Sequence, residues 1–490
     1  MLLLAQAPNK ETFVNAVNSR HPKALPFLFF TEMWERFGFY VVQGLLVLYM
    51  TQYFGFSDIT CDTISGTFMG LVYISPFIGG FLADKLLGFK TAILWGGIFL
   101  VLGYALLAIS SSTFLFYPAL ATIVVGNGLF KPNISSLLGV QYAAQDARRD
   151  AGFTIFYIGI NVGAALSGFS GYIKAACGWN FTFGLASIGL IIGLLAFLSG
   201  AKSIKHAENL PTNKRSMAVK LVFYCVLVII ALSFLLKIHA LASLLLPCAG
   251  IVLLAFLAML ILQQPVEYRK RLIILTTLII SSIVFWTLFF QMFISANLFV
   301  ERLVNKSLFG IPLTTTVFYA SEGLFIILLG PLFAWIWQTL GRRSANPSPI
   351  TKFFLGVLFA GIGFLVLSMS TLFASSAGFI NPLWIFFAYF LLTIGELFLS
   401  PIGLSAVTML APPQLMGMMM GIWFVGTGFG GIFAGILAKL ASVPDNVKNP
   451  LAKLSIYQTA FLDFAYLAFF VATVLFLMQL TLKNWLKDSA

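Results

Sequence analysis

Long apolar runs alternate with short polar breaks along the whole chain. A helix that crosses a bilayer needs about 20 consecutive, mostly apolar residues. Fourteen such runs occur, at residues 25–53, 62–83, 91–112, 114–138, 151–175, 180–200, 217–237, 240–263, 271–298, 314–340, 351–374, 381–410, 415–440 and 456–482. Because the alternating pattern of a membrane β-barrel is absent, we expect an all-α membrane protein with 14 transmembrane helices.

The composition supports a membrane location. Of the 490 residues, 60% are hydrophobic and 9% are charged, whereas soluble domains average about 25% charged residues. A net charge of +13 would suit a nucleic-acid-binding protein, but its distribution does not. If the N-terminus is cytoplasmic, twenty of the 29 basic residues fall in cytoplasmic segments and seven in external ones. This positive-inside bias predicts that both termini are cytoplasmic and that nucleic acid is not a partner.

The polar breaks divide the runs into groups of six, two and six. A polar stretch at 202–215 follows the sixth run, and a basic break at 267–271 follows the eighth. The two middle runs have almost no polar residue within the membrane, which is typical of a structural insert. The predicted parts are a cytoplasmic N-terminal segment at 1–24, a six-helix bundle at 25–200, a linker with two extra helices at 201–270 and a second six-helix bundle at 271–490.

The loop after the second run carries Asp84, Lys85 and Gly88, and its counterpart in the second bundle reads Gly341-Arg342-Arg343. An ordinary positive-inside loop explains the bases but not the acid and the paired glycines. Acid, glycine turn and bases at this junction resemble the signature loop of the major facilitator superfamily. The resemblance implies two related six-helix halves, with a substrate site near the middle of the membrane between them.

Charges inside apolar runs cost roughly 2.5–3.5 kcal/mol each at the bilayer centre, so each needs a reason. In the first run, Glu32 precedes Arg36 by four residues, which is the favourable orientation for an ion pair on a helix. Glu35 is one position out of phase and could meet another helix. Two acids for one base leave a spare carboxylate, which favours proton coupling over a simple ion-pair brace. The other charges of this kind are Lys131, Glu322, Glu396 and Asp463.

Lys131 falls about midway along the fourth run, too deep for its ammonium to reach water comfortably. It needs a carboxylate, either from the first helix or from a substrate. We expect it to alternate between these two partners.

Three spaced motifs resemble those of the proton-dependent oligopeptide transporter family, and most closely those of its enterobacterial di- and tripeptide permeases. They are Glu32-x-x-Glu35-Arg36-Phe37-x-x-Tyr40, Phe156-Tyr157-x-x-x-Asn161-x-Gly163 and Gly395-Glu396-Leu-x-x-Ser400-Pro401. The resemblance runs from about residue 22 to 486 and includes the fourteen-helix layout of the bacterial members.

The resemblance implies roles for individual residues. Glu32, Glu35 and Arg36 would form the proton-coupling cluster. Lys131 would be the partner of that cluster and would also clamp the peptide C-terminal carboxylate. Glu396, with Asn161, would receive the peptide α-ammonium. The residues expected to line the cavity are Tyr40, Tyr73, Gln291 and Trp423, although aromatic residues in membrane helices often serve packing alone.

The sequence also departs from the family pattern. Many members carry an acid four residues after a tryptophan in helix 7, whereas Phe290 stands at that spacing after Trp286. Glu322 occupies a place where related permeases tend to carry Asn. It is either a second ammonium ligand, an additional proton carrier, or a residue near the external interface.

These features predict a proton-coupled symporter that imports di- and tripeptides by alternating access, acting as a monomer in the bacterial inner membrane. Its partners would be small peptides, protons and the lipid bilayer, with no cofactor and no metal. The alternative is uptake of another small zwitterionic solute, such as an amino acid or a peptide-like drug. An enzyme is not expected, because the sequence has three histidines and no metal-ligand or nucleophile–base motif.

Overall fold

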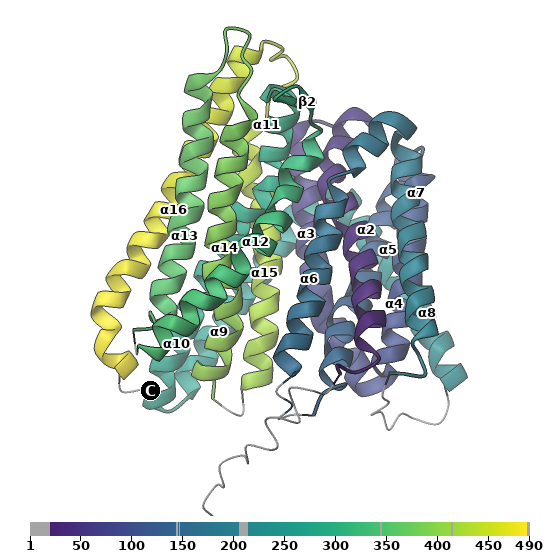
Figure 1. Cartoon of the computed structure of the whole chain (residues 1–490), viewed down its shortest axis with the longest axis vertical. Coiled ribbons are helices and arrows are strands. Elements are labelled where there is room, and N and C mark those ends of the chain that lie inside the picture. The colour runs from purple at the N-terminus through teal and green to yellow at the C-terminus, as the bar shows by residue number, and fades with distance from the viewer. Residues whose placement is uncertain are drawn as a thin grey trace, which may run out of the picture.

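The computed structural model describes residues 20–143, 146, 148–204, 214–343, 345–412 and 415–487, and these form an upright bundle of helices (Figure 1). The long helices are α2 (Leu25–Gln52), α3 (Asp58–Leu82), α4 (Phe89–Ala108), α5 (Thr113–Gly139), α6 (Arg149–Ser167), α7 (Ser170–Ser199), α8 (Lys214–Lys237), α9 (His239–Gln263), α10 (Val266–Phe289), α12 (Thr315–Arg342), α13 (Pro349–Ser370), α14 (Pro382–Leu410), α15 (Met416–Ala438) and α16 (Pro450–Lys487). The shorter elements are η1 (Ala83–Leu87), η2 (Phe290–Phe293), α11 (Ser295–Leu303), η3 (Thr371–Phe373), η4 (Lys439–Ala441) and a two-stranded hairpin, β1 (Ser307–Leu308) and β2 (Ile311–Pro312).

The fourteen long helices confirm the fourteen predicted from the apolar runs. In the described part of the chain, twelve of these helices are long and apolar enough to cross a membrane, judged by length and composition alone. The other two long helices, α2 and α6, carry charged and polar residues, yet α2 packs along both α6 and α7 inside the bundle. The charged residues of α2 are buried within the protein, as are Asn161 and Ser167 of α6, whereas Asp150 and Thr154 near the start of α6 are exposed.

The break predicted between the fifth and sixth runs lies inside α7, at Gly178 (φ 80°, ψ 178°), where two helices meet across a kink. In addition, the helix expected at 151–175 is interrupted by a bend between Ser167, where α6 ends, and Ser170, where α7 begins. Thr316 satisfies the backbone groups freed by the bend, because its hydroxyl donates to the Gly168 carbonyl at 2.6 Å and accepts from the Gly171 N–H at 3.0 Å. Hydropathy alone did not show the bend, because its stabilising partner comes from another helix.

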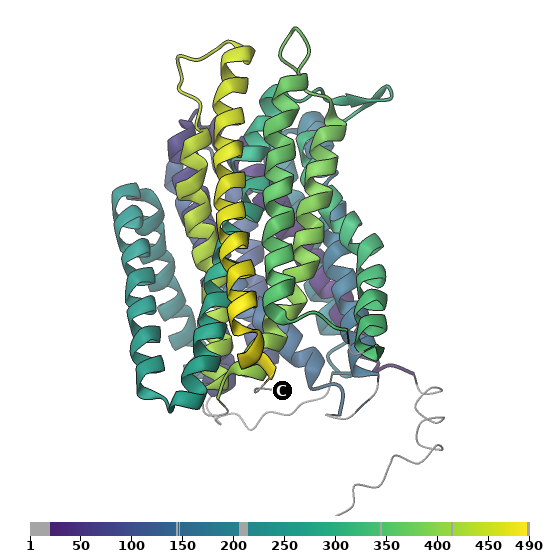
Figure 2. The ribbon, with the colours of Figure 1, turned by 90° about the vertical axis from the view of Figure 1, so that its left-hand side faces the viewer.

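The helices form two groups, which we call the N-half (α2–α7) and the C-half (α10–α16). Each half has its own large cluster of buried apolar side chains. The α8–α9 hairpin stands on the outside of the bundle (Figure 2), with α8 against α5 and α9 against α10 and α3. In both α8 and α9, only 17% of the apolar stretch that could cross the membrane is buried inside the protein. This low burial fits a peripheral insert.

The two halves meet most extensively where α3 packs against α15, while α6 meets α12 on another face. Glycine makes the α3–α15 approach possible: a Cβ on Gly66 would lie 2.5 Å from the Gly435 Cα, and one on Gly431 would lie 2.7 Å from the Gly70 nitrogen. Such small-residue contacts let helix backbones pack closely in membranes. The charged residues of α2, α5, α12 and α14 are held between these two contacts.

Candidate transport site

The α2 cluster forms, but its pairing differs from the expectation. Arg36 binds Glu35 through two hydrogen bonds, one from Nε to Oε2 and one from Nη2 to Oε1 at 2.6 Å. Glu32 is the looser partner, with Oε1 at 3.5 Å from Arg36 Nε and with a buried Oε2 that has no hydrogen-bond partner among the described residues. All three side chains are nearly inaccessible to solvent. The spare carboxylate is therefore Glu32, whereas Glu35 binds Arg36 and also interacts electrostatically with Tyr104 on α4 and Lys131 on α5.

Asn127 completes this cluster, and the sequence analysis missed it. Its Oδ1 accepts from Arg36 Nη2 at 3.2 Å, and its Nδ2 donates to the Val72 carbonyl at 2.8 Å. The amide thereby ties α2 to α5 and α3. The sequence could have indicated this role, because Asn127 stands between two glycines in an apolar run, and a buried amide needs hydrogen-bond partners.

Lys131 lies one helical turn from Asn127 on α5. Its ammonium rests over the Tyr73 ring, 4.7 Å from the ring centroid. Within the described part of the chain it forms no ion pair shorter than 4 Å, although it interacts electrostatically with both Glu32 and Glu35. The Lys131 ammonium is thus near the α2 acids without forming an ion pair with either. Its alternation between a carboxylate of α2 and a substrate stays a prediction.

Two further acids meet on the C-half. Glu322 on α12 and Glu396 on α14 are 4% and 8% exposed, and their side chains interact electrostatically. Glu396 Oε2 is buried and has no hydrogen-bond partner among the described residues. Glu322 is therefore a buried neighbour of Glu396, and the suggestion that it lies at the external interface was wrong. Asp463, by contrast, is exposed on α16.

Tyr40 and Tyr73 lie between these acidic and basic groups. Each interacts electrostatically with Arg36 on one side and with both Glu322 and Glu396 on the other. Asn161 on α6 is buried, donates to its own helix at the Tyr157 carbonyl (2.9 Å), and has its backbone against Gly323, next to Glu322. These three predicted residues are thus brought together with the charged pairs.

Gln291 and Trp423 are placed differently. The Gln291 amide donates to the Ala434 carbonyl at 2.9 Å, and its carbonyl accepts from the Ser295 hydroxyl at 2.6 Å. Trp423 packs over Gly403 and against Phe353, with ring centroids 6.0 Å apart. In this conformation both side chains are engaged within the C-half.

The signature loop forms a single π-helical turn, η1. Asp84 and Lys85 are exposed on it, and Gly88 ends the turn with φ of 74°. A side chain would be strained at this positive φ, which accounts for the glycine. Asp84 makes no ion pair with any residue that the structure describes.

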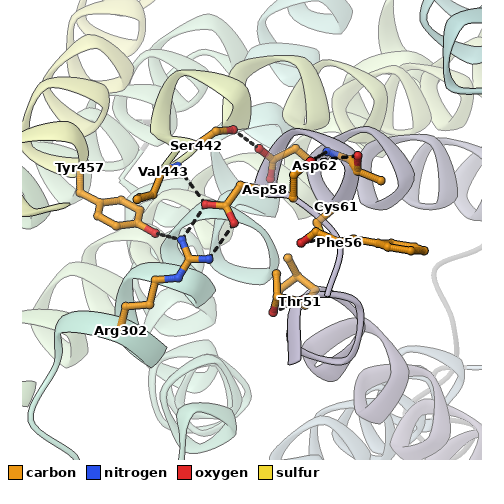
Figure 3. Close-up of polar contacts among 12 residues, drawn as sticks. Thr51, Phe56, Asp58, Cys61, Asp62, Arg302, Ser442, Val443 and Tyr457 are labelled. Atoms are coloured by element: carbon orange, nitrogen blue, oxygen red, sulfur yellow. Dashed lines mark hydrogen bonds and ion pairs between the residues drawn. The ribbon is translucent and has the colours of Figure 1, made fainter. Parts of the chain in front are cut away.

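The sequence analysis also missed a polar cluster at the end of the bundle away from the C-terminus, which we call the distal end. Asp58 on α3 binds Arg302 on α11 through two hydrogen bonds of 2.6 and 2.7 Å, and Arg302 also donates to the Tyr457 hydroxyl at 3.0 Å (Figure 3). Nearby, Ser442 donates to Asp62 at 2.7 Å. We call these five residues the distal clasp, because they join the N-half to the C-half.

Other bonds between the halves lie on the same side. Asn297 donates to the Gly44 carbonyl at 2.7 Å, and Gln52 donates to Glu301 at 2.9 Å. The clasp was not foreseen because Asp58 and Arg302 lie near helix ends, where charges are usually solvated. Their partnership spans 244 residues, and no local pattern indicates it.

A two-halved helical bundle with buried acids and bases between the halves defines a multi-pass membrane transporter. The POT family pattern matches residues 90–457, so the chain belongs to the POT family, whose members are proton-coupled peptide symporters.

Similar proteins span the whole chain. Dipeptide and tripeptide permease A of Klebsiella pneumoniae (strain 342) is 34% identical over 99% of this chain and 98% of its own length. The permease of the same name from Escherichia coli (strain K12) is 33% identical over 99% and 97%, respectively. Among solved structures, a peptide transporter POT in complex with sulfate is 32% identical, with a TM-score of 0.80 over 96% of this chain and 99% of its own. A bacterial homologue of human drug peptide transporters is 29% identical, with a TM-score of 0.84 over 96% and 99%.

Proposed function

We propose that this protein is a proton-coupled symporter that imports di- and tripeptides across the bacterial inner membrane. The observation that carries the proposal is the opposition of two charged poles. Arg36 and Lys131 lie on the N-half, whereas Glu322 and Glu396 lie on the C-half, with two tyrosines between them. A zwitterionic peptide requires such an arrangement.

The proposed peptide orientation follows from these charges. Lys131 has no carboxylate within ion-pair distance among the described residues and would bind the peptide C-terminal carboxylate. Glu396, with Asn161 beside it, would bind the α-ammonium. Tyr40 and Tyr73 would contact the peptide bonds between the poles, and Gln291 and Trp423 would join the lining in another conformation. Contacts directed at the peptide backbone permit broad specificity, because they ignore side-chain identity.

Glu32 is the proposed site of proton coupling. A buried carboxylate oxygen without a hydrogen-bond donor is costly as an anion, and Arg36 is already bound to Glu35. A proton on Glu32 would remove this cost and leave Lys131 free for the substrate carboxylate. Proton binding and peptide binding would then favour each other, which is what symport requires.

The distal clasp would be the closed external gate. This assignment takes the distal end as external, with both termini in the cytoplasm, as the distribution of basic residues predicts. Alternating access would then require the Asp58–Arg302 pair to open when the halves rock apart, with the η1 loop of Asp84, Lys85 and Gly88 on the opposite side.

One chain would be a complete transport unit, because both poles belong to the same chain. We propose the division into an N-terminal segment (1–24), a first bundle (25–200), a linker with two extra helices (201–270) and a second bundle (271–490). The linker hairpin would anchor the transporter in lipid without lining the pathway.

Uptake by proteoliposomes tests the function. Labelled dialanine should accumulate under an inward proton gradient, and an uncoupler should abolish the accumulation. Competition should be strong with dipeptides and tripeptides and weak with single amino acids and amidated dipeptides. Equal competition by alanine would favour the alternative, a transporter for small zwitterionic solutes in general.

A further inference from the structure

Glu322 and Glu396 are buried carboxyl groups that interact across the contact between α12 and α14. Neither forms an ion pair within 4 Å with a cation that the structure describes. Two neighbouring buried carboxylates repel each other, which favours one proton shared by the pair while no cation is bound. Glu396 Oε2 is buried and has no hydrogen-bond donor among the described residues.

Within the described part of the chain, no cation forms an ion pair with either acid. The titratable groups that interact with the pair from α2, α3 and α6 are hydroxyls: Tyr40, Tyr73 and Tyr157. Helix α15 has no titratable residue between its ends, and those of α10 lie in its first two turns, at the end away from the distal clasp.

Cations on the neighbouring helices contact other groups. Examples are Arg36 with Glu35, Arg302 with Asp58, Lys174 with Gln52, Arg149 over the Phe153 ring at 5.9 Å and Lys352 over the Trp337 ring at 4.1 Å.

The pair can therefore accept two positive charges from a ligand. The proposed α-ammonium site needs one carboxylate, and a second ligand cation would take the place of the shared proton, which leaves to water. We infer that Glu322 forms a subsite for a cationic side chain on the first residue of the peptide, such as Lys or Arg. This inference rests on the peptide-transport function proposed above and adds a substrate preference to it.

The geometry restricts the preference to one end of the peptide. A basic side chain on the first residue extends from the carbon that bears the α-ammonium, so both cations reach the same pair of acids. A basic side chain on the second residue lies toward Lys131 and gains nothing. Because a proton competes with the second cation, the preference for a basic first residue should rise with pH.

Competition against labelled dialanine in proteoliposomes tests the inference, with Lys-Ala, Ala-Lys and Ala-Ala as unlabelled competitors. In the wild type, Lys-Ala should compete roughly tenfold better than Ala-Ala, the effect of one charge-assisted hydrogen bond, and Ala-Lys should not. The advantage should increase between pH 6 and 8. In Glu322→Gln, the ratio of Lys-Ala to Ala-Ala competition should fall to that of Ala-Lys to Ala-Ala, and its pH dependence should disappear.

Other results would overturn the subsite. They are an unchanged Lys-Ala advantage in Glu322→Gln, an equal advantage for Ala-Lys, or loss of dialanine transport in both Glu322→Gln and Glu322→Asn although each variant folds. The last result would assign Glu322 to α-ammonium binding or to proton transport. Failure of wild-type protein to transport any dipeptide would instead refute the proposed function.

Discussion

Asp58 and Arg302 lie 244 residues apart in the chain and form an ion pair with nitrogen–oxygen distances of 2.6 and 2.7 Å. The carboxylate also accepts the Val443 N–H at 2.9 Å. The pair is therefore embedded in a network that involves α3, α11 and the segment before α16. It joins the two halves at the distal end, which makes it the strongest candidate for a contact that must break during transport.

Arg302→Ala should destabilise this closed conformation, because it leaves Asp58 without its counter-ion. We expect a cost on the order of 2–3 kcal/mol, below the ~3–5 kcal/mol of a fully buried pair, because 22% of the Arg302 side chain is exposed. Thermal unfolding in detergent should show a lower midpoint, and cysteines placed beside the clasp should be alkylated faster from the external side.

Arg148→Ala is the matched control, because it removes an ion pair outside the membrane. Arg148 donates to Asp146 at 2.7 Å and lowers the pKa of Asp146 to about 2, so this pair stays ionised at all transport pH values. Its loss should change thermal stability less, because this pair joins residues two apart in one segment, whereas the clasp pair joins the two halves. An equal effect of the two substitutions would argue against a gating role for the clasp.

Glu32→Gln should separate coupling from binding. Because Glu35 holds Arg36, a neutral residue at position 32 leaves the clamp in place, and the protein should fold and exchange peptides. Proton-driven accumulation should be lost while counterflow between peptide pools persists. Glu35→Gln should instead lose both activities and lower thermal stability, because it breaks the bidentate pair with Arg36. Full accumulation by Glu32→Gln would refute its proposed role.

Lys131→Ala should weaken binding of peptides that have a free C-terminal carboxylate. Loss of one hydrogen bond to a charged group costs ~1.5–3 kcal/mol, or roughly a tenfold to hundredfold loss of affinity. Amidated dipeptides should be affected much less, because they present no carboxylate. A side-by-side competition curve for dialanine and its amide measures the difference, and a uniform loss for both would indicate a structural role.

Gly66→Leu should prevent the close packing of α3 on α15. Even a Cβ at this position would lie 2.5 Å from the Gly435 Cα, and overpacking typically costs ~1–3 kcal/mol. Gly184→Ala on α7 is the control, because its Cβ would have its nearest neighbour at 3.9 Å. Thermal unfolding of purified protein should show a lower midpoint for Gly66→Leu and little change for the control.

The helices could be predicted because a bilayer imposes a length and an apolar composition on each span. Even α2 was recognised, since its charges interrupt an otherwise apolar run. The same local information could not assign partners. Spacing favoured Glu32 for Arg36, whereas the structure gives Glu35 both strong bonds, because long side chains at adjacent positions can meet alongside the helix. Asn127 then accepts a further bond from Arg36 Nη2.

Contacts between helices far apart in the sequence could not be predicted from local sequence patterns. Glu322 could be identified as unusual, but its contact with Glu396 depends on how α12 and α14 pack. The bend at Gly168 likewise depends on Thr316, 148 residues away. Buried polar residues could thus be located from the sequence, while the identity of each partner required the fold.

Simultaneous measurement of peptide and proton flux tests the central claim most directly. Proteoliposomes that contain a pH-sensitive dye are held at an inside-negative potential, and dialanine is added outside. The account predicts that dialanine entry acidifies the lumen in the wild type, and that Glu32→Gln exchanges peptide without acidification. Wild-type dialanine entry without acidification of the lumen would contradict it.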